Sequence, residues 1–268
     1  SYFGIMNPLR SRLALLNAHI HPPIIRSCCE LGYGQGLSIN IHASASENKW
    51  IGTDFNPSQA YFSKTLGDKS GNGAISKDLD FKSFTEDPLL PNFDYICLHG
   101  VWSWVSEKNR REIIKFISKK LNPGGLLYLS YNVTSGNAPM ISARSAMKRQ
   151  YDLLRAEGVA FDQAVKSAIA FTKEMFTSET IYKKAYPRME KMLSDLTEKP
   201  SEYIAHEFLN ENWTPMNFID LASYCDDAKL TYAGSANYID ELDVVNFTEL
   251  QITQLNKLRD RVHRENSK

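Results

Sequence analysis

Residues 30–36 read ELGYGQG, and this short stretch decides which fold the sequence predicts. The apolar run 24–31 that leads into it has the composition of a buried strand, and the run 37–46 that follows has that of a helix. Its three glycines let the backbone turn tightly and leave room for a ligand to lie against it. The dinucleotide fingerprint G-x-G-x-x-G would need glycine where this chain has Leu37. The stretch therefore predicts a ligand-binding turn and disfavours a dinucleotide as the ligand.

Strand-like and helix-like runs alternate on both sides of this turn. We expect strands at 24–31, 49–55, 74–79, 93–100 and 126–133. We expect helices at 7–20, 37–46, 56–66 and 107–121. Alternation with short connections is typical of a doubly wound, mostly parallel sheet, which is an α/β fold of the Rossmann-like kind.

The pattern changes after the fifth predicted strand. Helical periodicity predicts helices at about 141–157, 161–175 and 178–197, which would form an insertion or cap. A further helix leads to an expected strand at 229–239, and Thr248 is expected to cap a terminal helix over 246–268. The predicted domains are an N-terminal helical segment (1–23), an α/β core (24–139 and 214–268) and a helical insertion (140–213).

Composition and charge restrict the possible partners. Lys plus Arg number 31, as do Asp plus Glu, so no general electrostatic attraction to nucleic acid or to an anionic membrane is expected. No apolar run approaches the roughly 20 residues that a membrane span needs. The four cysteines form no C-x-x-C pair, which disfavours a metal site and a disulfide scaffold. We therefore expect a cytoplasmic protein that holds no metal.

Glu30 and Asp54 indicate what the turn binds. A pyrophosphate favours a helix N-terminus without negative side chains nearby, whereas the carboxylate of Glu30 suits a cationic ligand. S-adenosylmethionine carries an amino group and a sulfonium, so it meets this requirement. Asp54 ends the second predicted strand, where an acidic side chain can accept hydrogen bonds from both ribose hydroxyls.

With these residues in register, the sequence resembles the class I S-adenosylmethionine-dependent methyltransferases. The stretch LNPGGLLYLSY (121–131) is similar to the turn into the family's fifth strand, and the resemblance covers 24–133 well and 216–236 more loosely. It implies S-adenosylmethionine as cofactor, S-adenosylhomocysteine as product, and no metal. The cofactor-binding positions that carry over are Glu30, Gly32, Gly34 and Gly36 at the methionine end, Asp54 and Phe55 at the ribose, Asp80 and Phe81 at the adenine, with Asp78 as the competitor of Asp80, and His99.

A narrower resemblance is to one bacterial methyltransferase subfamily. It is carried by CELGYGQGLSIN (29–40), GTDFNPSQA (52–60), LHGVWSWVSEKNR (98–110) and AHEFLNENWTPMNFIDLA (205–222). The best-understood members of that subfamily are protein-lysine methyltransferases, and many carry an added methyltransferase regulatory domain. Members often continue past this C-terminus, and the chain starts at Ser1, so we expect a part of a longer protein.

His99 and two tryptophans lie where the fourth predicted strand ends. Ligands of doubly wound sheets bind at the carboxyl ends of the strands, so we expect His99 to line the site and to take part in catalysis. Trp102 is expected to form a substrate-binding wall through cation–π contact with a lysine ammonium or the sulfonium. Trp104 has the same chemistry, or it packs against the next helix, and the sequence leaves both interpretations open.

Three further candidates lie outside this stretch. Tyr131 and Asn132 follow the fifth predicted strand, where Tyr131 would orient a substrate amine or simply cap the sheet, and Asn132 would contact substrate. His206 begins the segment that returns from the helical insertion. A cap over the crevice would place it opposite His99 as a second catalytic histidine, and an ordinary surface histidine is the alternative.

The sequence thus predicts in-line methyl transfer from S-adenosylmethionine to a nucleophile, with a protein lysine amine as the preferred acceptor. An O- or N-methyltransferase acting on a small molecule or a sugar is the alternative. Two other classes stay open, a non-catalytic cofactor-binding regulatory protein and an NAD-linked oxidoreductase. The expected partner is the methyl acceptor, without nucleic acid or membrane, and the oligomeric state is left open.

Overall fold

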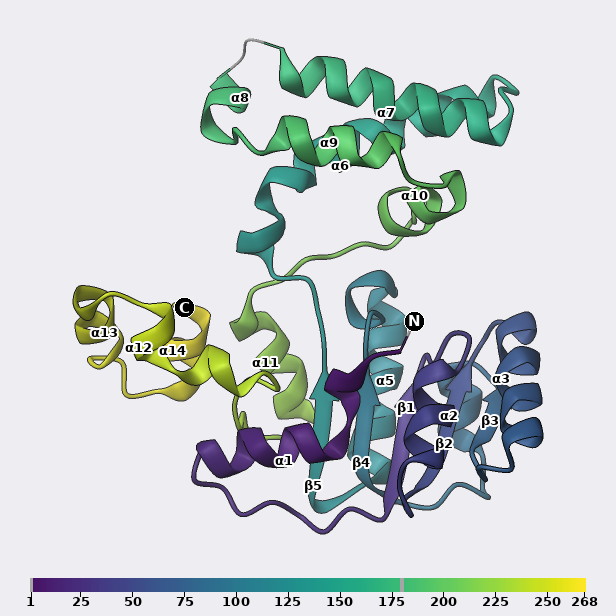
Figure 1. Cartoon of the computed structure of the whole chain (residues 1–268), viewed down its shortest axis with the longest axis vertical. Helices are drawn as coiled ribbons and strands as arrows, with labels where there is room; N and C mark the ends of the chain where they lie inside the picture. The colour runs from purple at the N-terminus through teal and green to yellow at the C-terminus, as the bar shows by residue number, and fades with distance from the viewer. Residues whose placement is uncertain (1, 179–180) are drawn as a thin grey trace. The chain divides into compact units, whose positions relative to one another are not determined.

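Five parallel strands form the centre of the α/β core that the sequence predicts. The computed structural model describes residues 2–178 and 181–268 (Figure 1). The strands are β1 (Ser27–Leu31), β2 (Lys49–Asp54), β3 (Ile75–Asp78), β4 (Phe93–Leu98) and β5 (Leu121–Leu129). Their order in the sheet is β3-β2-β1-β4-β5, and each neighbouring pair is parallel. The prediction of a Rossmann-like α/β fold is confirmed, including the weakly marked third strand.

The strand order reverses between β1 and β4, which places a topological switch point there. Glu30 of β1 is in register with Gly52 of β2 and with Cys97 of β4. Parallel strands present their carboxyl ends at one edge, and ligands of such sheets bind at that edge beside the switch point. The residues after Glu30 and after Cys97 are therefore the ones that the fold offers to a ligand.

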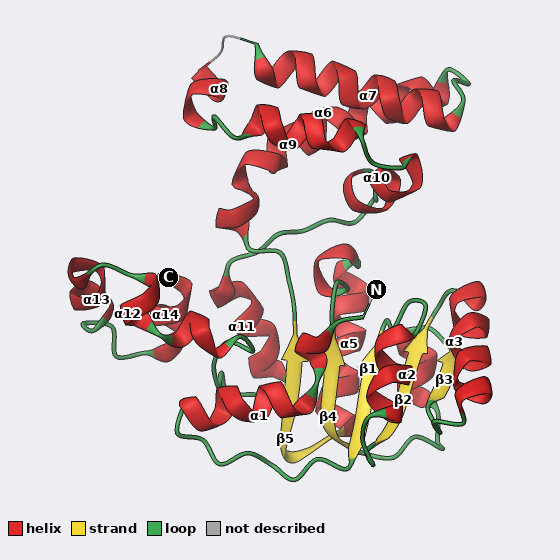
Figure 2. Ribbon diagram, viewed as in Figure 1, coloured by secondary structure: helices red, strands yellow, loops and turns green. Residues whose placement is uncertain are grey.

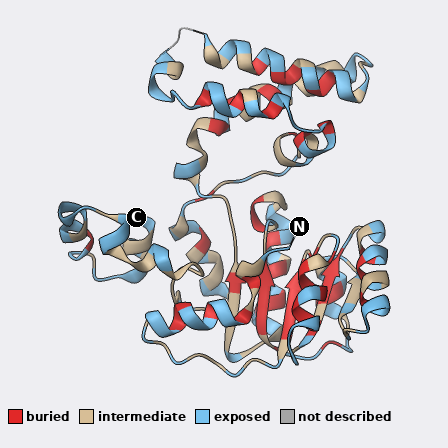
Figure 3. Cartoon of the chain, in the orientation of Figure 1, coloured by how far each residue is buried: buried red, intermediate tan, exposed pale blue. Residues whose placement is uncertain are grey.

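Helices cover both faces of the sheet (Figure 2). One face packs against the N-terminal segment, with η1 (Gly4–Met6), α1 (Pro8–Asn17), α2 (Leu37–Ser44) and α3 (Pro57–Ser70). The other face packs against α4 (Phe81–Glu86), α5 (Glu107–Lys120) and α11 (Phe218–Asp227). Burial is concentrated along the strands between these layers, as Figure 3 shows.

Local sequence explains where these helices begin. Asn56 caps α3, because its side chain accepts hydrogen bonds from two backbone N–H groups while Pro57 occupies the first turn. Ser106 caps α5, because its hydroxyl accepts the backbone N–H of Asn109. Along α5, Ile113, Ile114 and Ile117 are buried together, and Lys108, Lys115 and Lys119 are exposed. That spacing is the helical period, so one face of α5 packs against the sheet.

Residues Asn132–Pro215 form a second compact unit, and the first unit comprises Ser1–Tyr131 and Met216–Lys268. The second unit contains α6 (Thr134–Ala156), α7 (Phe161–Thr177), α8 (Ile181–Ala185), α9 (Met189–Thr197) and α10 (Ser201–Phe208). It has its own apolar core, in which Met147, Ile169 and Leu193 are buried. The helical segments predicted after strand five are thus present.

The predicted helix 178–197 differs in detail. It is two helices, α8 and α9, and its residues 179–180 lie outside the described part of the chain. Pro187 explains the interruption, because proline disfavours helical backbone at the residue before it and cannot donate a helical hydrogen bond.

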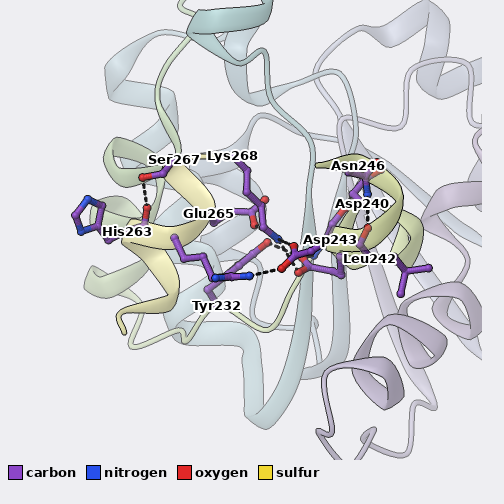
Figure 4. A network of polar contacts seen from close by, with 12 residues as sticks. Tyr232, Asp240, Leu242, Asp243, Asn246, His263, Glu265, Ser267 and Lys268 are labelled. Carbon is purple, nitrogen blue, oxygen red and sulfur yellow. Dashed lines mark hydrogen bonds and ion pairs between the residues drawn. The ribbon is translucent and has the colours of Figure 1, made fainter. Parts of the chain in front are cut away.

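The strand predicted at 229–239 is wrong, since this segment does not join the five-stranded sheet. The backbone N–H of Ser235 donates to Oε1 of Glu241 over 2.7 Å, and the hydroxyl of Tyr232 donates to the same atom over 3.2 Å. Gly234 has a φ of +147°, outside the strand region. Figure 4 shows the network of polar contacts to which Tyr232 belongs, and Lys268 also takes part in this network. A side-chain carboxylate therefore satisfies a donor that a strand ladder would have used.

The terminal helix predicted at 246–268 is also divided. The structure has α12 (Asp243–Asn246), α13 (Glu249–Leu255) and α14 (Arg261–Asn266), after the short η3 (Tyr238–Glu241). Thr248 caps α13 in a full capping box with Gln251, so the predicted cap is confirmed. Asp260 caps α14 through the backbone N–H of His263, and this second cap marks a new helix start that the sequence interpretation missed.

Candidate cofactor and methyl-transfer site

The glycine turn joins β1 to α2 and has the backbone that only glycine adopts easily. Gly32, Gly34 and Gly36 all have positive φ, at 71°, 57° and 71°. A Cβ atom on Gly32 would lie 2.6 Å from the Val101 side chain, and one on Gly36 would overlap Ser63. A Cβ on Gly34 would meet nothing nearer than 3.7 Å. The turn is therefore packed on two sides and open at Gly34, which leaves room for a ligand to approach the backbone.

Glu30 is the buried acid beside this turn. Its side chain is 3% exposed, and its Oε2 atom has no hydrogen-bond partner among the residues that the structure describes. Burial, with a smaller contribution from the Asp54 carboxylate, raises the pKa of Glu30 to about 8. A buried carboxyl without a partner is costly unless a cation or donor reaches it. Glu30 therefore fits the ammonium group of a methionine-type ligand.

Asp54 holds the turn from the end of β2. Its Oδ2 accepts the backbone N–H of Gly34 and its Oδ1 that of Asn56, both over 2.9 Å. Burial raises the pKa of Asp54, and these two hydrogen bonds oppose that shift. Each carboxylate oxygen retains a second lone pair that could accept a ribose hydroxyl. Phe55, the next residue, is 76% exposed, so its ring is accessible to a nucleobase.

The residues predicted at the adenine lie at the end of β3. Asp80 is exposed and caps α4, because its Oδ1 accepts the backbone N–H of Ser83 over 2.7 Å, which lowers the pKa of Asp80. Phe81 packs partly against the core. Asp78 is exposed and in register with Asp54 on the neighbouring strand. Asp78 and Asp80 thus both lie at the end of β3, and Asp80 also caps α4.

His99 lies just past the end of β4 and is held by two aromatic side chains. Its Nδ1 is 2.8 Å from the hydroxyl of Tyr128, and its ring centroid is 4.3 Å from that of Phe3. The backbone N–H of Phe3 donates to Oγ of Ser38 in the first turn of α2 over 2.9 Å. Burial lowers the pKa of His99. The N-terminal segment therefore reaches both the tip of β4 and the helix that follows the glycine turn.

Tyr128 and Phe3 were missed by the sequence interpretation. Tyr128 lies inside the apolar run of β5, where nothing marks its hydroxyl as different from a core tyrosine. Phe3 precedes the first helix and carries no motif. The signal that could have found Tyr128 is its register opposite Cys97, two residues before His99.

Trp102 belongs to the core. It is fully buried in the short helix η2 (Trp102–Trp104), its indole N–H donates to Sδ of Met216 over 3.1 Å, and its ring meets the edge of Tyr224. These contacts explain its burial, and they give no support to the predicted substrate wall. Trp104 is half-buried at the end of the same short helix.

The remaining candidates are Tyr131 in the first unit and Asn132 and His206 in the second. Tyr131 ends the first unit and packs against its core; burial, with a smaller contribution from Glu265, raises its pKa to about 12. Asn132 opens the second unit. His206 lies exposed in α10 of the second unit, with Nδ1 3.0 Å from Glu207, whose carboxylate raises the pKa of the imidazole. Their predicted catalytic and substrate roles stay predictions.

Three structural findings concern other kinds of site. Within residues 2–178 and 181–268, no group of three or more His, Cys, Asp or Glu side chains could hold a metal ion. In the same described part, no helix combines the length and the apolar character that a bilayer crossing requires. The cysteines Cys28, Cys29, Cys97 and Cys225 are free thiols.

Comparison with known protein families decides the class of this site. Residues 29–129, which contain the glycine turn, Glu30, Asp54 and His99, match a family model described as a methyltransferase domain. The chain contains a class I methyltransferase domain. Residues 200–268 match a second model, described as a predicted methyltransferase regulatory domain. That second match runs from α10 of the helical unit into the C-terminal helices of the first unit.

Related proteins match this chain over more than the methyltransferase domain. An uncharacterized protein of Synechocystis is 34% identical over 269 residues, which cover 98% of this chain and 52% of that protein. An uncharacterized protein of Rickettsia prowazekii is 26% identical over 198 residues, which cover 72% of this chain and 76% of that protein. The chain thus spans about half the length of its Synechocystis relative.

Solved structures show the same fold. PKMT2 from Rickettsia typhi, in complex with AdoHcy, has a TM-score of 0.79 to this chain at 23% identity. The match covers 99% of this chain and 51% of PKMT2, and a second structure of PKMT2 gives the same TM-score at 22% identity. Both units of the chain are therefore represented in that fold.

Proposed function

We propose that this chain binds S-adenosylmethionine and directs its methyl group to a nucleophile, with a protein lysine amine as the acceptor. The observation that carries the proposal is the buried Glu30, whose Oε2 lacks a partner among the described residues, beside a turn that is open at Gly34. The ammonium of the cofactor's methionine end would supply the missing partner. Asp54, at the end of the adjacent strand, would accept the ribose hydroxyls.

In this proposal the side chains bind and align rather than react. S-adenosylmethionine supplies an activated methyl group when it is bound, and the protein has to orient the acceptor in line and exclude water. An amine acceptor must be neutral before it can attack. Tyr131, with a pKa raised to about 12, keeps its proton at neutral pH, so it would orient such an amine by accepting an amine N–H at its phenol oxygen and would not remove its proton.

Titration calorimetry tests the cofactor assignment. S-adenosylmethionine should bind and NAD should not, because the Leu37 side chain replaces the third fingerprint glycine. Asp54→Ala should weaken binding by about 1–3 kcal/mol, since charge-assisted hydrogen bonds to the ribose would be lost. Asp68→Ala is the matched control, because it removes an exposed carboxylate from α3. Binding of NAD in place of S-adenosylmethionine, or unchanged affinity in Asp54→Ala, would contradict the assignment.

The lysine acceptor is the finer part of the proposal. It is supported by the subfamily resemblance of the sequence and by the fold shared with PKMT2. The test is transfer of a radiolabelled methyl group to candidate proteins, small molecules and sugars, followed by hydrolysis and identification of the labelled species. Labelled methyllysine is the expected product. A labelled small molecule or sugar would replace lysine as the acceptor, and tight cofactor binding without any labelled product would favour the non-catalytic alternative.

A further inference from the structure

A short series of hydrogen bonds ends on His99. The backbone N–H of Gly100 donates to Oγ of Ser130 over 3.0 Å. Ser130 in turn hydrogen-bonds the side chain of Tyr128, whose hydroxyl is 2.8 Å from Nδ1 of His99. The backbone N–H of Ser130 also donates to the carbonyl of Leu98 over 3.1 Å. The paired ends of β4 and β5 therefore fix all members of the series.

The direction of the series follows from its first member. A backbone N–H can only donate, so Oγ of Ser130 accepts there and its own proton is available to Tyr128. The hydrogen bond with Ser130 acts to lower the pKa of Tyr128. Burial outweighs it and raises that pKa to about 12, so Tyr128 keeps its proton at neutral pH and can donate it to His99.

An imidazole nitrogen that accepts a hydrogen bond carries no proton. With Nδ1 of His99 as the acceptor, the proton of the neutral ring must be on Nε2. Burial lowers the pKa of His99, which favours the neutral ring. The Phe3 ring lies against the imidazole, with centroids 4.3 Å apart, and so restrains its rotation.

We propose that Tyr128 and Ser130 are positioning residues that hold His99 as a hydrogen-bond donor through Nε2, and not as a base. The proposal rests on the proposed function, because it assigns part of the cofactor as the acceptor of this donor. Cys97 is in register with Glu30 and with Tyr128, and the Tyr128 hydroxyl reaches His99, so the His99 ring lies on the face of the sheet from which Glu30 projects. With Glu30 at the ammonium of the methionine end, the acceptor assigned to His99 is the carboxylate of the same group.

Nitrogen NMR of the whole chain, labelled with ¹⁵N-histidine, reads the tautomer without any methyl acceptor. The spectrum of His99→Gln identifies the His99 signals among the six histidines. In the wild-type chain we expect Nε2 to be protonated and Nδ1 unprotonated. Tyr128→Phe removes the donor and should give signals averaged between the two tautomers, and Ser130→Ala should shift them in the same direction. A proton on Nδ1 in the wild type would overturn the proposal.

Tyr182→Phe is the matched control, because it removes a tyrosine hydroxyl that donates to the carbonyl of Pro139 in the helical unit. It should leave the His99 signals unchanged. Should Tyr128→Phe fail to fold, Ser130→Ala carries the test by itself. Unchanged His99 signals in every folded variant of the series would show that Tyr128 and Ser130 do not set the tautomer.

Cofactor binding by calorimetry is the second readout. S-adenosylhomocysteine should bind Tyr128→Phe about tenfold more weakly than wild type, as expected for one weakened hydrogen bond to a carboxylate. Decarboxylated S-adenosylmethionine lacks that carboxylate and should bind both proteins equally. An equal loss with both ligands would overturn the carboxylate assignment. Failure of every such ligand to bind the wild type would instead refute the proposed function, while the tautomer result would stand.

Discussion

Glu30→Gln tests whether the buried acid of the site lowers the stability of the protein without cofactor. Burial, with Asp54 as the smaller cause, raises the pKa of Glu30 from 4.5 to about 8. In the unfolded chain this carboxyl titrates near its ordinary value, about 4.3. Between these two values the folded protein holds a proton that the unfolded chain has released. Stability is therefore fully retained below about pH 4 and falls as the pH rises towards 8, by about 1.4 kcal/mol per pH unit.

The glutamine variant cannot titrate at this position, so its free energy of unfolding should lack this slope. Between pH 5.5 and pH 7.5 the wild type should lose about 2–3 kcal/mol relative to Glu30→Gln. Urea denaturation of both proteins at several pH values measures the difference directly. Glu47→Gln removes an exposed carboxylate and should leave the pH dependence of wild type unchanged. A constant difference between wild type and Glu30→Gln across this range would refute the reasoning.

The same carboxyl links binding to proton release. A cationic ligand stabilises the ionised form of Glu30, so cofactor binding at pH 7 should release close to one proton from this side chain. Calorimetry in buffers of different ionisation enthalpy counts that proton, and Glu30→Gln should release correspondingly less while binding more weakly. Equal proton release by both proteins would show that the cofactor's cation does not reach Glu30.

Further predictions concern the glycine turn and the core tryptophan. Gly36→Ala would place a Cβ against Ser63 at a positive φ, and should lower the unfolding free energy by more than the roughly 1–2 kcal/mol of the backbone strain alone. Gly34→Ala meets no close atom, so in urea denaturation it should lose only about that strain, yet calorimetry should show weaker cofactor binding. Trp102→Phe removes the hydrogen bond to Met216 and should lower stability by about 1–3 kcal/mol with cofactor affinity unchanged; a selective loss of affinity would restore its predicted site role.

The strands of the sheet could be predicted because their signals are local. The strands β1, β2 and β4 are mostly apolar runs that lead to Gly32, Asp54 and Gly100, and alternation with helices predicts their parallel order. The segment 229–239 has a similar run, but its partner is Glu241, whose carboxylate takes the Ser235 N–H. A local pattern cannot show that a nearby side chain competes with the sheet for a backbone donor.

The residues of the candidate site also differ in whether local sequence reveals their surroundings. Glu30, the glycines and Asp54 are readable because one turn and one strand end place them together, and the backbone N–H of Gly34 donates to Asp54. Trp102 has the residue type of a ligand wall, yet its indole N–H pairs with Met216, 114 positions away. The side chain that meets its hydrogen-bond need is far from it in sequence, so residue type alone could not show that the indole is buried and paired.

Tyr128 is the converse case, because it is a residue of core type whose hydroxyl contacts the candidate site residue His99. Its ring is buried with the apolar residues of β5, and its hydroxyl reaches His99 because β4 and β5 pair in the register Cys97 to Tyr128. Moving β5 by one residue would turn this hydroxyl to the other face of the sheet. The chemistry of His99 therefore depends on strand register as much as on the histidine itself. Aligning the end of β5 on β4 thus recovers a positioning residue that motif comparison passes over.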